Sequence, residues 1–258
     1  MLIRPRVIPS LLIQDGGLVK TKQFKNPEYL GDPINAVKIF NEKGVDELCI
    51  MDISKDRYSR GPDFGLLEEI ASEAFMPLAY GGGIRNLDDA KKIFRIGFEK
   101  VILNRVLAEN EMLASDIIRL FGSQSVIASI DIKKSFFGGY TVYTNSARTI
   151  VCKDPLGWAK KVERLGAGEI LLSNIDHEGM QNGFELGIVR QIADNAEIPV
   201  IACGGARNVN DLFLALRDGH SDAVSAGSMF VYYGDKKGIL INFPTEEELI
   251  EKGVYNYE

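Results

Sequence analysis

MPLAYGGGIRN at residues 76–86 returns later in the chain as IPVIACGGARN at residues 198–208. Each copy is a short apolar run that ends in tandem glycines and continues into a basic residue and an asparagine suited to cap a following helix. Glycine lets backbone N–H groups approach an anion closely, and the start of the next helix adds the positive end of its dipole. Each copy therefore indicates either a phosphate-binding turn between a strand and a helix or a tight turn without a ligand, and one Gly-rich turn alone is weak support for the first.

The repeat extends far beyond the glycines. DPINAVKIFNEKGVDE at residues 32–47 matches DPLGWAKKVERLGAGE at residues 154–169, at the same offset of 122 residues (198 − 76 and 154 − 32). A helix, a glycine stop and the following strand all recur at this offset. The chain is therefore predicted to consist of two similar halves, at about residues 1–122 and 123–245.

Apolar, mostly β-branched runs alternate with amphipathic helical windows along the chain. Strands are expected at residues 7–13, 48–52, 78–80, 101–104, 126–131, 170–174, 200–202 and 223–226. Helices are expected at residues 33–43, 64–73, 87–96, 112–121, 156–165, 186–195, 209–218 and 246–251. Strands that are apolar on both faces and separated by helices predict a parallel sheet. Eight such units predict a single (β/α)8 barrel over residues 1–258, because an open doubly wound sheet does not explain the half-chain repeat.

The barrel predicts where the chemistry lies, because functional side chains of this fold gather at the C-terminal ends of the strands. The candidate phosphate-binding residues at these ends are Gly83, Asn104, Gly179, Gly205, Gly227 and Ser228. The repeat places Gly83 with Asn104 and Gly205 with Ser228 at equivalent positions, which suits a phosphorylated small molecule with a phosphate at each end. Residues 135–152 alternate around Gly138 and Gly139 and are predicted to form a hairpin above the barrel.

Composition excludes several classes of protein. The chain has 258 residues, is 45% hydrophobic and carries a net charge of −6, with no basic stripe, so a nucleic-acid partner is not expected. Its three cysteines are widely spaced, which indicates reduced thiols in a cytoplasmic protein and no metal site. The apolar run near the N-terminus is short and interrupted by Pro9, so neither a signal peptide nor a membrane span is expected, and no motif indicates a cofactor.

Several motifs resemble those of the HisF family, the cyclase subunits of imidazole glycerol phosphate synthase in histidine biosynthesis. The resemblance extends from Arg6 to about Gly234, and the sister isomerase family HisA shares the two-half barrel. The motifs are DGGLVK (15–20), GDP (31–33), GGGIRN (81–86), FGSQSVIASIDIK (121–133), LGAGEILL (165–172) and IPVIACGGA (198–206). The run GSQSVIASIDIK and the hairpin sequence YTVYTN favour HisF. The segment from Asp235 onward departs from the family and supports no function.

The resemblance implies that ammonia from a HisH-like glutaminase subunit enters below the barrel and reacts above it, between two aspartates at the ends of strands one and five. Ring closure needs one group that removes a proton and one that donates it. Asp131 keeps the strand-five position, whereas the strand-one position is Leu12. Alignment of VIPSLLI (7–13) with VIASIDI (126–132) within this chain also places Leu12 opposite Asp131, and this alignment needs no reference to the HisF family.

Other side chains near the strand ends are candidates either to replace the missing carboxylate or, like Lys20, for a catalytic role of their own. Asp15 more readily shapes the DGG turn, and Asp52 either supports Asp131 or holds a loop. Asp176 ends strand six, and His177 is better explained as a turn residue than as a catalytic one. Lys20 matches the family's loop lysine over the substrate, with a solvated loop lysine as the alternative.

Charged residues precede four strands at the opposite end of the barrel. Arg6, Glu47, Lys100 and Glu169 match the family's ring of charges around the ammonia entrance, although strand-start charges on a solvated face are the simpler explanation without the resemblance. Glu99 takes the place of an acidic residue that helps the partner become active.

Two functions remain open. The first is a HisF-like paralogue that delivers ammonia to a third protein, a sugar amidotransferase of bacterial surface-sugar (lipopolysaccharide) synthesis, since a leucine in the lumen disfavours charged ammonium. The second is an active cyclase, a lyase that uses Asp131 with a displaced helper such as Asp15 or Asp52.

Overall fold

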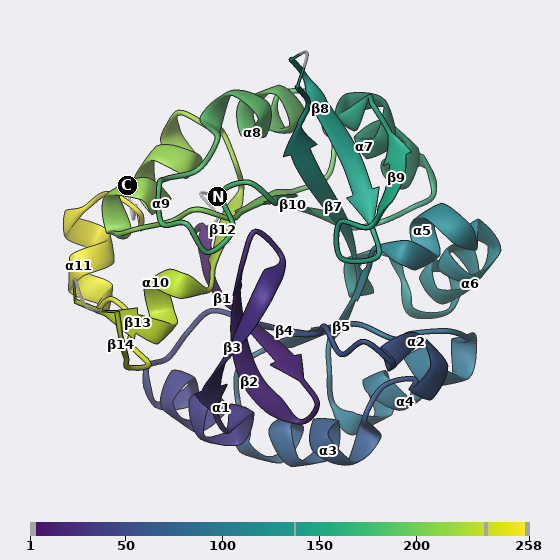
Figure 1. Cartoon of the computed structure of the whole chain (residues 1–258), viewed down its shortest axis with the longest axis horizontal. Coiled ribbons are helices and arrows are strands. Elements are labelled where there is room, and N and C mark those ends of the chain that lie inside the picture. The colour runs from purple at the N-terminus through teal and green to yellow at the C-terminus, as the bar shows by residue number, and fades with distance from the viewer. Residues whose placement is uncertain (1–3, 137, 235–236, 256–258) are drawn as a thin grey trace.

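A closed barrel of eight parallel strands forms the centre of the computed structural model, which describes residues 4–136, 138–234 and 237–255. Around the barrel the strands are β1 (Arg6–Gln14), β4 (Leu48–Asp52), β5 (Leu78–Gly81), β6 (Lys100–Leu103), β7 (Val126–Lys134), β10 (Glu169–Asn174), β11 (Val200–Cys203) and β12 (Ala223–Ala226). The barrel closes because β12 pairs with β1 and β7 pairs with β10, all in parallel register. The prediction of a (β/α)8 barrel is confirmed (Figure 1).

Helices cover the outside of the barrel (Figure 1). The main ones are α1 (Pro33–Glu42), α3 (Phe64–Glu73), α4 (Leu87–Ile96), α6 (Glu111–Phe121), α7 (Pro155–Arg164), α8 (Leu186–Ala193), α9 (Val209–Arg217) and α11 (Glu246–Glu251). Asn86 and Asn208 cap α4 and α9, because each side chain accepts a hydrogen bond from the backbone N–H three residues on. The capping expected after each glycine turn is confirmed.

Short elements decorate the C-terminal end of the barrel. They are β2 (Gly17–Lys22), β3 (Lys25–Gly31), α2 (Arg57–Arg60), α5 (Arg105–Glu109), β8 (Tyr140–Thr144), β9 (Thr149–Cys152), α10 (Ser228–Val231), β13 (Tyr232–Tyr233) and β14 (Gly238–Ile239). The 3-10 turn at Ser123–Ser125 directly precedes β7 and so lies at the opposite end. Strands β8 and β9 lie in the excursion expected at residues 135–152 and extend β7 in antiparallel fashion. The β2–β3 hairpin was not predicted, because its charged residues and Pro27 interrupt the alternation typical of a strand.

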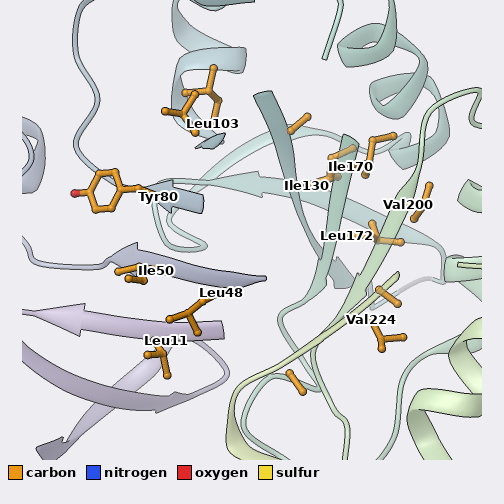
Figure 2. Close-up of a cluster of buried hydrophobic side chains, with 14 of the residues drawn as sticks. Leu11, Leu48, Ile50, Tyr80, Leu103, Ile130, Ile170, Leu172, Val200 and Val224 are labelled. Atoms are coloured by element: carbon orange, nitrogen blue, oxygen red, sulfur yellow. The ribbon is translucent and has the colours of Figure 1, made fainter. Parts of the chain in front are cut away.

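Two layers of apolar side chains hold the fold together. The outer layer lies between strands and helices and contains Leu11, Leu48, Tyr80, Leu172 and Val224, among others (Figure 2). The inner layer fills the barrel and consists of Ile8, Cys49, Ala79, Ile102, Ile127, Leu171, Ile201 and Ala223, with Met51 and Cys203 packed against it. Alternate residues of each strand point to the two layers, which explains why the strands read as continuous apolar runs.

The C-terminal segment completes the ring of helices. Val254 and Tyr255 are buried, and the Tyr255 hydroxyl donates to the carboxylate of Asp46, which also pairs with Arg4. Asp235, where the resemblance ends, lies outside the described residues, as does Lys236. The segment therefore has a structural role at the N-terminal end of the barrel, although the sequence assigned it no function.

None of the described helices is both long and apolar enough to pass through a membrane.

Candidate functional site

A cavity of about 560 Å³ opens at the C-terminal end of the barrel. Residues from both halves line it, including Leu12 and Lys20 from the first half and Asp131 and Glu178 from the second. The strands converge at this end, so side chains far apart in sequence share one space. The expected location of the site is therefore occupied by a cavity of a size that suits a small molecule.

Asp131 lies on β7 and is buried at the base of the cavity, 7% exposed. Its Oδ2 accepts a hydrogen bond from Nδ2 of Asn104 at 3.2 Å, and its Oδ1 accepts one from Oγ of Ser129 at 3.2 Å. Burial raises the pKa of Asp131 to about 7, against which the Ser129 hydrogen bond acts weakly. A carboxyl group with this pKa exchanges protons near neutral pH, which suits a general acid or base.

The raised pKa of Asp131 makes stability depend on pH. The folded protein keeps the proton that the unfolded chain releases above pH ~4, so stability falls as pH rises from about 4 to about 7. We expect Asp131→Asn to remove this penalty and to stabilise the protein by ~2–4 kcal/mol at pH 8, but much less at pH 4. Urea unfolding at both pH values measures the difference, and an equal effect at the two values would contradict it.

Leu12 lies on β1 and reaches the same cavity with 9% of its surface exposed. Its backbone is in register with Met51 of β4, and Met51 also lines the cavity. This wall is therefore apolar, whereas Asp131 contributes a titratable carboxyl group on the strand-five side. The asymmetry expected from the two halves is present in the site.

Neither of the two carboxylates that could act together with Asp131 is placed to do so. Asp15 is exposed, sits in the β1–β2 turn with a φ of 52°, and does not line the cavity. Asp52 lines it, but its two oxygens accept from Arg60 at 3.0 Å and from the N–H of Ser54 at 2.8 Å. The carboxylate of Asp52 therefore holds the loop after β4, which was one of the two roles left open for it.

Asp176 and His177 also serve the loop after β10. The carboxylate of Asp176 accepts the N–H of Lys134 at 2.8 Å, and Nδ1 of His177 lies 2.7 Å from the carbonyl of Gly183. Neither residue lines the cavity. Both side chains thus have structural partners in a turn.

Lys20 reaches the cavity from the β2–β3 hairpin and pairs with Glu178, a residue that sequence reasoning missed. Glu178 also accepts from Oγ1 of Thr21 at 3.0 Å, so it holds the hairpin against the loop after β10. Burial lowers the pKa of Lys20 to about 8, whereas the carboxylate beside it favours the charged form. The sequence signal for Glu178 was its place after β10, in the segment DHEG, whose other three residues were all considered.

We expect Glu178→Gln to loosen the β2–β3 hairpin. Lys20, only 8% exposed, would lose its counter-charge, and removal of one partner of a buried pair typically costs about 3 kcal/mol. Trypsin should then cleave after Lys22 or Lys25 faster than in the unmodified chain. Glu28→Gln is the control on the same hairpin, because Glu28 is 60% exposed and 3.8 Å from Lys22, and it should change the cleavage rate little.

The candidate phosphate-binding residues that line the cavity are distributed unevenly between the two halves of the barrel. Gly179, Gly205, Gly227 and Ser228 all line the cavity, and the hydroxyl of Ser228 is buried without a hydrogen-bond partner in the described part of the chain. In the first half Asn104 lines the cavity but donates to Asp131 and accepts from Thr144. Gly83 does not line it. The second half thus has the more open candidate anion cradle.

The glycines of both turns are also required by packing. A Cβ at Gly205 would lie 2.2 Å from the carbonyl oxygen of Gly183, and one at Gly83 would lie 2.7 Å from that of Arg57. Both residues have a positive φ, 115° and 71°. Their presence is therefore explained by the turns even without a phosphate.

The four charged residues expected at the opposite end form a closed ring. Nζ of Lys100 lies 2.8 Å from a carboxylate oxygen of Glu47 and of Glu169, and Arg6 contacts the same two carboxylates at 2.5 and 2.9 Å. Burial opposes the charge of Arg6, but the carboxylates of Glu169 and Glu47 outweigh it and raise its pKa. Glu99 is exposed at the same end of the barrel, next to Lys100. The ring closes one end of the apolar lumen, and the cavity opens at the other.

Comparison with known proteins identifies the family of this chain. A model of the family "Histidine biosynthesis protein" matches residues 6–237. The chain belongs to this family. It is 47% identical over 248 residues to "Putative imidazole glycerol phosphate synthase subunit hisF2" of Pseudomonas aeruginosa, across 96% of this chain and 99% of that protein. It is also 42% identical to "Putative imidazole glycerol phosphate synthase subunit HisF" of Leptospira interrogans and 40% identical to the hisF3 protein of Vibrio vulnificus, each across 96% of this chain and at least 95% of the relative. The chain is thus a HisF-like synthase subunit, as the motifs indicated.

Proposed function

We propose that this HisF-like subunit receives ammonia from a HisH-type glutaminase at the charged ring and passes it through the barrel to a third protein, a sugar amidotransferase of surface-sugar synthesis. The observation that carries this proposal is that Leu12 lines the cavity. It provides an apolar wall at the position where ring closure needs a carboxylate. Asp15 and Asp52 do not replace that carboxylate, because one lies outside the cavity and the other is bound to Arg60.

The lumen supports passage of neutral ammonia. A layer of aliphatic and sulfur-containing side chains lies between the ring and the cavity, and burial raises the pKa of the Cys49 thiol, so this group stays uncharged. An apolar passage favours ammonia over ammonium, because desolvation penalises the charged form. The partner is proposed because relatives of this chain are named as synthase subunits, and we expect the exposed Glu99, next to Lys100 of the ring, to contact it.

The alternative is an active cyclase of histidine biosynthesis. The pKa of Asp131, about 7, favours it, as does the unpartnered hydroxyl of Ser228 in the second anion cradle. This function requires a second group that exchanges a proton with the substrate. Glu178 is the other carboxylate of the second half that lines the cavity, and it is paired with Lys20.

The two functions differ in whether the chain forms imidazole glycerol phosphate without a partner protein. We expect at most a trace of imidazole glycerol phosphate when the purified chain is incubated with ammonium salts and the phosphoribosyl-linked aminoimidazole carboxamide substrate. With a HisH-type glutaminase and ¹⁵N-amide glutamine, labelled ammonia should still be released. Turnover at a rate normal for the family would show that the chain is a cyclase and that another group does the work of the missing carboxylate.

A further inference from the structure

Four arginines surround the first glycine turn, and one of them differs from the rest. Three lie beside carboxylates, in the pairs Arg60–Asp52 at 3.0 Å, Arg85–Asp89 at 3.3 Å and Arg105–Glu109 at 2.5 Å. Arg57 is only 7% exposed, yet no carboxylate of residues 4–136, 138–234 or 237–255 lies within ion-pair distance of it. A buried cation without a counter-charge is costly, and the Tyr58 ring, whose centroid lies 4.6 Å from Cζ of Arg57, offsets only part of this cost, so the environment of Arg57 favours a bound anion.

The guanidinium of Arg57 is held in place but not fully used. Its Nη1 donates to the carbonyls of Ile53 at 3.1 Å and Ser54 at 2.6 Å, and its Nη2 donates to Oγ of Ser146 at 2.8 Å. Guanidinium has five N–H donors, so Nε–H and one Nη2 hydrogen remain without an acceptor within the described ranges. Adjacent nitrogens of this kind form the fork that binds an oxyanion through two parallel hydrogen bonds.

The surroundings of Arg57 are cationic. Arg57 lines the cavity together with Lys55 and Arg148, both exposed and without an ion pair in the part of the chain that the structure describes. Lys55 precedes Arg57 on the loop after β4, and Arg148 follows Ser146 between β8 and β9. The carboxylates that line the cavity are each engaged by other groups, in the contacts Asp52–Arg60, Asp131–Asn104 and Glu178–Lys20.

We propose that Arg57, with Lys55 and Arg148, binds a phosphoryl group of the ligand on the β4 and β8 side of the cavity. A phosphoryl group carries a charge of about −1.5 to −2 near pH 7. Three cations therefore match a phosphoryl group better than they match a singly charged carboxylate. Gly81 and Gly82 line the cavity in this half but Gly83 does not, so the Arg57 side chain supplies charged donors beside the glycine backbone. This inference rests on a phosphorylated ligand in the cavity, and it does not depend on the route of ammonia.

The test follows the Nε–H signal of Arg57 in ¹H–¹⁵N spectra of the full chain. The signal is identified by its loss in Arg57→Lys, or in Arg57→Gln if the lysine variant does not fold. On titration with inorganic phosphate at constant ionic strength, we expect this signal to move and saturate. The Nε–H signal of Arg105, which already donates to Glu109 at 2.5 Å, should stay unchanged and serves as the matched control. In Arg57→Lys, backbone signals of Ser146 and Ala147 should report phosphate binding weaker by ~10-fold, because lysine lacks the fork.

Two results would overturn the proposal. If phosphate moves signals near Ser228 but leaves the Arg57 signal in place, only the second-half cradle binds phosphate. If acetate shifts the Arg57 signal at the same concentrations as phosphate, the site recognises a single negative charge and not a phosphoryl group. A failure of the ammonia-delivery function leaves both measurements unaffected, so the two proposals are separable.

Discussion

Leu12→Asp should raise ammonia-dependent formation of imidazole glycerol phosphate by ~10²–10⁴-fold over the unmodified chain, which is the usual contribution of one positioned general acid or base. Leu12 and Asp131 line the same cavity, so the variant provides two carboxyl groups in one space. Like charges that share a buried site separate their pKa values, and one group then donates while the other accepts. The pKa of Asp131 is already raised to about 7, which suits it to be the protonated partner.

Leu12→Asn is the matched control for this gain. Asparagine has nearly the shape of aspartate and forms hydrogen bonds, but it does not titrate. We expect Leu12→Asn to remain inactive, and equal activity of the two variants would show that polarity rather than proton transfer limits the unmodified chain. Steady-state rates with ammonium salts, without a glutaminase, measure the cyclase step alone.

Glu47→Gln should lower the free energy of unfolding by ~3 kcal/mol, at the lower end of the cost of breaking a buried pair. Glu47 is 2% exposed, and its Oε2 accepts from Nη1 of Arg6 at 2.5 Å and Nζ of Lys100 at 2.8 Å. Glutamine keeps the shape but leaves two cations beside one remaining carboxylate, that of Glu169. Arg6 is partly solvated, with 27% of its side chain exposed, which moderates the loss.

Urea unfolding of two further variants tests whether the ring contributes more to stability than an ordinary surface ion pair does. Asp116→Asn removes a carboxylate 2.7 Å from Arg119, whose side chain is 82% exposed, and should cost less than about 1 kcal/mol. Addition of Lys100→Met to Glu47→Gln should restore part of the lost stability, because Arg6 and Glu169 then balance each other. If Glu47→Gln costs no more than Asp116→Asn, the ring is solvated and does not seal the lumen.

Sequence reasoning identified some of the residues that line the cavity and missed others. Leu12 and Asp131 were identified by comparison of two strands, because alternation along a strand decides which residues share a face. Glu178 and Arg57 were missed, since Glu178 lies in a loop and Arg57 begins the short helix α2, and the contacts of both depend on distant partners. Lys20 and Glu178 are separated by 158 residues, and no local pattern indicates that their side chains meet.

The sequence by itself determined the barrel, its strand and helix positions and the loss of one carboxylate. Periodicity, helix caps and repeated glycine turns act over a few residues, so they can be read without coordinates. Only the tertiary structure decided which charges pair. Barrel closure brings Arg6, Glu47, Lys100 and Glu169 into one ring, and it leaves the buried Arg57 without a carboxylate partner among the residues that the structure describes. The physical reason is that the free energy of a charge depends on its neighbours in space and on its burial, neither of which is local in sequence.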